Sequence, residues 1–127
     1  MNVGRVDQDL KSSVSELLLA AVPSIVALAL YYSLAIHMRL SLGHWPTDIG
    51  ERGFPPALVS HARVERLYFV ALLWFGMFVF PVELLLCAFV APLERYLRFL
   101  LWSAIIFVAS CILRLAVPPA FFYWWID

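Results

Sequence analysis

Three long runs of apolar residues, separated by polar segments, set the pattern of the sequence. They cover Leu17–Ile36, Leu67–Val90 and Leu97–Val117, and the middle run is apolar on every face. At about 1.5 Å per residue, its roughly 24 residues form a helix of about 36 Å, which can cross a bilayer core of about 30 Å. The pattern therefore predicts three membrane-spanning helices.

The polar segments between the runs set the expected boundaries. We expect spans near residues 15–38, 60–91 and 96–117, a long first loop over about 39–59, and a tight second turn at Ala91–Arg95. The predicted fold class is therefore all-α, a single membrane domain over residues 1–127 with three transmembrane helices.

Capping and proline signals refine these helices. Ser13–Glu16 fits an S-x-x-E capping box, which predicts the start of the first helix. Pro23 is expected to bend that helix, and Pro56 suits the first position of the second. Pro118–Pro119 should end the third helix.

Composition supports the membrane class. Of 127 residues, 64% are hydrophobic and 14% charged, with nine basic and nine acidic residues. A soluble domain of this length could not bury so much apolar surface, whereas a lipid bilayer can solvate it. The zero formal net charge provides no basic surface for nucleic acid, so no nucleic-acid partner is expected.

Aromatic residues gather at the expected membrane boundaries. Trp45 and Phe54 lie in the long loop, and Phe121–Trp125 follows the third span. Such aromatic residues are typical of the membrane interface, where we expect them to lie.

One short segment resembles a known group of proteins. His37–Pro46 contains Leu42-Gly-His-Trp-Pro46, which resembles an L-G-(H/R)-W-P loop after the first span of small bacterial multi-pass membrane proteins of unknown role. The resemblance implies only the class of protein. It brings no activity, cofactor or catalytic residue.

Helical spacing predicts that the second and third spans pack as a hairpin. One inward face on each helix follows the intervals i, i+4, i+7 and i+11. The faces consist of Gly76, Phe80, Glu83 and Cys87, and of Ser103, Phe107, Ser110 and Arg114. In this hairpin the two cysteines are separated by roughly 18 Å in depth, which excludes a disulfide between them.

Glu83 is the polar residue placed deepest in the second span. In the predicted bundle it shares one depth with Ser24 and Ser103, far from any Arg or Lys. An unpaired carboxylate is costly in hydrocarbon, so we expect a neutral, hydrogen-bonded acid. Three roles remain open: an interhelical hydrogen bond, a polar contact with another subunit, and a relay for protons or cations.

The three histidines all fall on the long-loop side. His37, His44 and His61 could bind zinc or haem, but their spacing matches no metal signature. The sequence also contains no nucleophile elbow, phosphate-binding loop or pair of carboxylates that would indicate a catalytic site. We therefore expect no cofactor, no metal site and no enzymatic activity.

These observations favour a non-enzymatic accessory or structural subunit of a bacterial inner membrane. It would act through helix contacts with the lipid bilayer, with other membrane subunits or with copies of itself. Two alternatives stay open. One is a redox-complex subunit that binds haem or quinone, and the other is a homo-oligomeric pore or carrier using Glu83.

Overall fold

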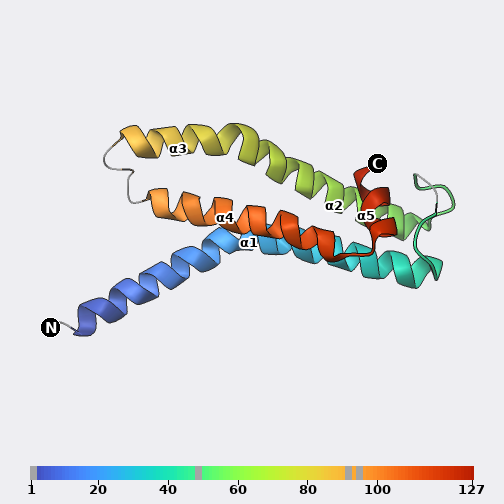
Figure 1. The fold of residues 1–127 in the computed structure, drawn as a ribbon, viewed down its shortest axis with the longest axis horizontal. Coiled ribbons are helices and arrows are strands. Elements are labelled where there is room, and N and C mark those ends of the chain that lie inside the picture. Colours follow the sequence, from blue (N-terminus) through green and yellow to red (C-terminus); the bar gives the residue numbers. More distant parts are fainter. Residues whose placement is uncertain (1–2, 48–49, 91–92, 94–95) are drawn as a thin grey trace.

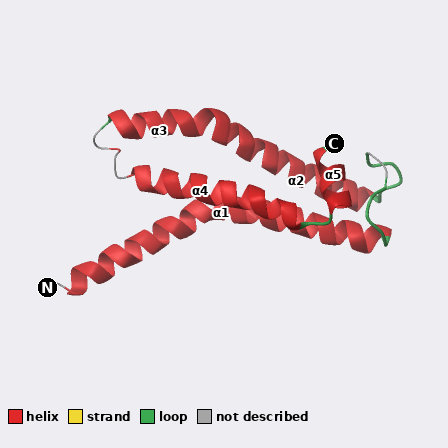
Figure 2. Ribbon diagram, viewed as in Figure 1, coloured by secondary structure: helices red, strands yellow, loops and turns green. Residues whose placement is uncertain are grey.

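The computed structural model describes residues 3–47, 50–90, 93 and 96–127, with side chains from residue 14 onward. In chain order its elements are α1 (Val3–Leu42), α2 (Pro56–Trp74), the π-helical η1 (Phe75–Val79), α3 (Phe80–Phe89), α4 (Leu97–Leu113), the 3-10 turn η3 (Arg114–Ala116) and α5 (Pro119–Ile126). Helices account for almost all of the described chain, and the long connection is a loop (Figure 2).

Three helices are long and apolar enough to cross a membrane, as the sequence predicts. They are the segments Val14–Leu42, Pro56–Phe89 and Leu97–Ala116. Figure 1 shows α1, α4 and the continuous α2–η1–α3 helix running along one another. The all-α fold class is therefore confirmed.

The helix boundaries confirm some of the predicted signals and correct others. Pro56 occupies the first turn of α2, where its missing N–H costs nothing. The predicted capping box is wrong, because α1 is already helical from Val3 and passes through Ser13–Glu16 without interruption. The predicted turn at Ala91–Arg95 lies outside the described residues, except for Leu93.

Prolines shape the two longest helices. α1 continues through Pro23 and changes direction along its length (Figure 1). Pro81 has no N–H for the helical ladder, and the chain immediately before it widens into the π-helical turn η1, where the Phe80 N–H donates to Phe75 O. The continuous helix thus accommodates Pro81 without a break.

α1 is the central packing element of the bundle. Its buried residues recur at intervals of three and four along one face: Ala20, Ser24, Ala27, Tyr31, Leu34, Ala35 and Met38. The small residues among them let a neighbouring backbone approach closely, which favours packing in a membrane. α1 accordingly contacts α4 and α2 extensively, whereas α3 contacts α4 less.

The predicted hairpin of the second and third spans is therefore only part of the packing. The predicted inward faces are right, because Cys87, Ser110 and Arg114 are buried and Glu83 is half-buried. However, α4 has α1 as its main partner. Both cysteines are free, as expected.

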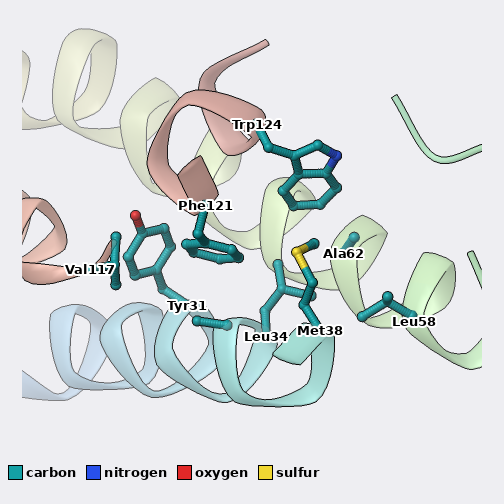
Figure 3. Close-up of a cluster of buried hydrophobic side chains, with 9 residues drawn as sticks. Tyr31, Leu34, Met38, Leu58, Ala62, Val117, Phe121 and Trp124 are labelled. Carbon is teal, nitrogen blue, oxygen red and sulfur yellow. The ribbon is translucent and has the colours of Figure 1, made fainter. Parts of the chain in front are cut away.

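The C-terminal aromatic segment forms part of the core. α5 folds back so that Phe121 (0% exposed) and Trp124 (3%) pack on Tyr31, Leu34 and Met38 of α1 (Figure 3). The prediction that this segment forms an interface belt is therefore wrong for these two residues. The prolines end one helix and begin another, which turns the aromatic rings inward.

The long loop is attached to the same core. The ring of Trp45 lies 6.1 Å from that of Phe121, and the ring of Phe54 lies 5.6 Å from that of Trp124. The Trp124 indole N–H also donates to Gly50 O at 2.9 Å. Loop and C-terminal helix therefore close one end of the bundle together.

Removing the central ring of this core should weaken the fold strongly. We expect Phe121→Ala to cost about 3–5 kcal/mol, the usual range for deleting a buried aromatic ring. The matched control is Tyr123→Ala, 68% exposed on the same helix, which should stay within about 0.5 kcal/mol. Denaturant unfolding in detergent micelles measures both, and equal costs would contradict this packing.

Accessibility of single cysteines tests the membrane topology. In a chain lacking both native cysteines, a membrane-impermeant thiol reagent should fail to label Val26→Cys, Val82→Cys and Ile105→Cys. Each position lies in a candidate span and is exposed on the protein, so only lipid would protect it. Arg52→Cys in the loop is the labelled control. Rapid labelling of any span position would contradict the topology.

Candidate functional site

An apolar cavity lies among α1, α4 and the continuous α2–η1–α3 helix. Its volume is about 460 Å³, and most of its wall consists of apolar side chains such as Leu72 and Phe80. Three polar residues, Ser24, Glu83 and Ser103, and one glycine, Gly76, interrupt this wall. We call this space the Glu83 cavity.

The structure thus brings the three predicted site residues to one cavity. Ser24 comes from α1, Glu83 from α3 and Ser103 from α4. No hydrogen bond joins any two of them: the Ser103 hydroxyl donates to Phe99 O of its own helix at 3.0 Å. The interhelical hydrogen bond expected for Glu83 is not formed with these serines.

Glu83 is half-buried and makes no hydrogen bond or ion pair with any residue that the structure describes. It also borders a second, smaller cavity of about 260 Å³ toward the turn between α3 and α4. Glu83 therefore lines two largely apolar cavities. An acid in this position can take a hydrogen-bond donor or a cation from outside the chain.

A buried ion pair occupies the other half of the bundle. Arg114 Nη1 lies 2.9 Å from Glu65 Oε1, with side-chain exposures of only 3% and 1%. Arg114 Nη2 donates to Ala27 O at 3.2 Å, and the Trp125 indole N–H donates to Glu65 Oε2 at 2.6 Å. Each carboxylate oxygen therefore has a donor.

Aromatic rings surround the guanidinium of this pair. Its central carbon lies 4.0 Å from the ring centre of Phe69, 4.6 Å from that of Tyr31 and 5.0 Å from that of Trp125. Cations over aromatic faces gain about 2 kcal/mol or more when desolvated. We call Tyr31, Glu65, Phe69, Arg114 and Trp125 the ion-pair cluster, and it joins α1, α2, η3 and α5.

Sequence reasoning missed this cluster. It placed Arg114 on the inward face of the third span without a partner and gave Glu65 no role, whereas both are buried and paired. One signal was available: Leu58, Ala62 and Glu65 follow i, i+4 and i+7, so the acid continues an apolar stripe. Its partner is 49 residues away, and only the tertiary fold identifies it.

Two of the three histidines meet. The Nδ1 atoms of His37 and His61 lie 3.0 Å apart, and His61 Nε2 lies 3.1 Å from Ser33 Oγ. His44 is separate, with its Nδ1 2.8 Å from Trp45 O. The described residues contain no group of three or more typical metal-ligating side chains.

Comparison with known proteins finds no matching family model, no matching curated protein and no matching solved structure. The likeness of Leu42–Pro46 to small bacterial membrane proteins remains a resemblance of one segment.

Breaking the ion pair from one side should be costly. Glu65→Gln leaves the Arg114 guanidinium buried without a counter-charge, and we expect a loss of about 3–5 kcal/mol in denaturant unfolding. Glu65→Gln combined with Arg114→Met should cost clearly less than the sum of the single changes, because no charge remains buried.

The exposed pair at the loop provides the control. Arg66 and Glu51 lie 3.5 Å apart with side chains 38% and 32% exposed. Glu51→Gln should cost at most about 1 kcal/mol, as is usual for surface pairs. Strictly additive costs at Glu65 and Arg114 would show that the two residues do not act as a pair.

Proposed function

We propose that this chain is a non-enzymatic subunit of a bacterial inner membrane that binds a transmembrane helix of a partner protein at the Glu83 cavity. The observation that supports the proposal most is the carboxyl of Glu83, which lies on an apolar wall and has no partner among the described residues. A helix carrying a hydrogen-bond donor or a cation at that depth would supply the missing partner.

The position of Glu83 in the helix makes the absence of a hydrogen-bonding or charged partner energetically costly. Glu83 lies six residues before the end of α3, so it is about 9 Å inside the helix end at about 1.5 Å per residue. An acid without a partner is costly in hydrocarbon, by up to about 2.5–3.5 kcal/mol on insertion scales if it is ionised at the bilayer centre. A contact that satisfies the carboxyl therefore gains stability when the partner binds.

The packing of the second span also supports the binding of a partner helix. None of its most apolar window is buried within this chain, against 28% for the first span. The wall made by Gly76, Phe80, Glu83 and Cys87 extends over about three helical turns, or about 16 Å. An elongated wall of this kind matches the side of a helix.

Gly76 adds a second observation. A Cβ atom built on this glycine meets nothing within 4 Å among the described residues, so the packing within the chain does not require glycine there. Small residues at helix interfaces let a second backbone approach. The open space at Gly76, one turn from Phe80 on the inward face, would allow the backbone of a partner helix to approach closely.

Photo-cross-linking in native membranes tests the proposal. A photo-reactive residue at Phe80, on the cavity wall, should yield one cross-linked product of defined mass. The same residue at Ile112, 62% exposed on α4, should not yield it. Gly76→Leu fills the approach and Glu83→Leu removes the carboxyl, so each should reduce the Phe80 product at least about fivefold.

Controls distinguish this result from misfolding and self-association. Glu83→Gln keeps a donor and an acceptor, so it should retain most of the product and cost within about 1 kcal/mol in stability. A product at twice the mass of the chain would assign the cavity to a second copy. A product unaffected by both Gly76→Leu and Glu83→Leu would contradict docking at this cavity.

The size of the cavity also favours a second candidate, a lipophilic ligand of the quinone type. Its volume of about 460 Å³ falls within the about 300–1,000 Å³ of small-molecule sites. Its wall likewise combines apolar side chains with few polar groups. Mass spectrometry of an organic extract of the purified chain would reveal such a ligand, and Gly76→Leu should reduce its occupancy.

A further inference from the structure

The paired histidines lie apart from the Glu83 cavity, at the loop end of the bundle. His37 is five residues from the end of α1, and His61 is five residues from the start of α2. Each is therefore about 7.5 Å from its helix end, at about 1.5 Å per residue. Both rings are only partly buried within the chain.

The hydrogen bonds around Ser33 assign the proton on each ring. The Ser33 hydroxyl donates its single hydrogen to Leu30 O at 3.0 Å. Its oxygen therefore accepts from His61 Nε2–H, which leaves a lone pair on His61 Nδ1. In the 3.0 Å contact between the rings, His37 Nδ1 is then the donor.

This arrangement matches the requirements of a metal ligand. A metal-bound histidine usually donates its other ring N–H to an oxygen, which fixes the ring and its tautomer. Ser33 does this for His61. His37 needs only to move its proton from Nδ1 to Nε2 to present a second lone pair.

The distance between the two nitrogens is close to that of chelation. Zinc–nitrogen bonds of about 2.0–2.1 Å at a tetrahedral angle place two nitrogens about 3.3 Å apart. The observed 3.0 Å differs from this by a few tenths of an ångström, which small rotations of the side chains provide. The two rings come from different helices, so one ion would join α1 to α2.

We propose that His37 and His61 bind one first-row divalent transition-metal ion, such as Zn²⁺, through their Nδ1 atoms. Water completes the coordination, because the described residues contain no third ligand. The ion would link the C-terminal end of α1 to the N-terminal end of α2. This inference does not depend on the proposed partner at the Glu83 cavity.

The competing explanation is a metal-free hydrogen bond between the rings, and one substitution separates the two. His37→Asn places an amide N–H near the position of His37 Nδ1, so it preserves donation to His61 but removes the imidazole ligand. His44→Asn is the matched control, because among the described residues His44 is hydrogen-bonded to Trp45 O and not to the histidine pair.

Zn²⁺ titration calorimetry on the full chain in nanodiscs tests the site. We expect one ion per chain in the wild type and in His44→Asn. His37→Asn and His61→Ala should each weaken binding at least about tenfold, because losing even a hydrogen-bonding partner of a metal ligand costs about 10–100-fold. Zn²⁺ should also raise the Tm of the first two proteins but not of the other two.

A second measurement covers the case in which a variant fails to fold. Electron paramagnetic resonance of Cu²⁺ bound to the wild type should show splitting from two equivalent nitrogens. A single nitrogen, or Zn²⁺ affinity that His37→Asn leaves unchanged, would overturn the proposal. Loss of Zn²⁺ binding in His44→Asn would overturn it as well, by assigning the ion to the loop.

Discussion

The buried ion pair between Glu65 and Arg114 is the interaction on which the rest of the structure depends. A charge removed from water is costly unless an opposite charge and hydrogen bonds surround it. Here both carboxylate oxygens and both terminal guanidinium nitrogens have partners. Only Arg114 Nε lacks one among the described residues. Because the buried polar atoms of Glu65 and Arg114 need these partners, they fix α1, α2, η3 and α5 relative to one another.

That constraint divides the bundle into two unlike halves. Around the ion-pair cluster, the helices are joined by hydrogen bonds, by aromatic contacts and by α5, which closes the end. Around the Glu83 cavity, an acid of the same chemistry has neither a counter-charge nor a donor among the described residues. The chain supplies partners for Glu65, whereas Glu83 has none among the described residues, and this difference directs the functional proposal to Glu83.

The histidine pair belongs to the closed half but does not take part in the ion pair. His61 lies one helical turn before Glu65, so a metal ion there would strengthen the contact between α1 and α2 close to the cluster. It would not touch the wall of the Glu83 cavity. The two proposed sites are therefore physically separate, because the histidine pair lies near the loop and Glu83 lies toward the opposite end of the bundle (Figure 1).

The sequence by itself determined the class of fold and much of its local geometry. Apolar runs of membrane length give three helices, because an unpaired backbone is not tolerated in lipid. Spacing also gave the inward faces that carry Glu83 and Ser103, because side-chain direction in a helix follows directly from residue number.

Only the tertiary structure decided which of these faces meet. The pairing of Glu65 with Arg114, of His37 with His61, and of Phe121 with the α1 core joins residues between 24 and 90 positions apart. Periodicity says which way a side chain points along its own helix and nothing about the helix opposite. The path of the loop, the bend of α1 and the return of α5 decide which helices face each other, so the partner of each buried charge is set only by the tertiary structure.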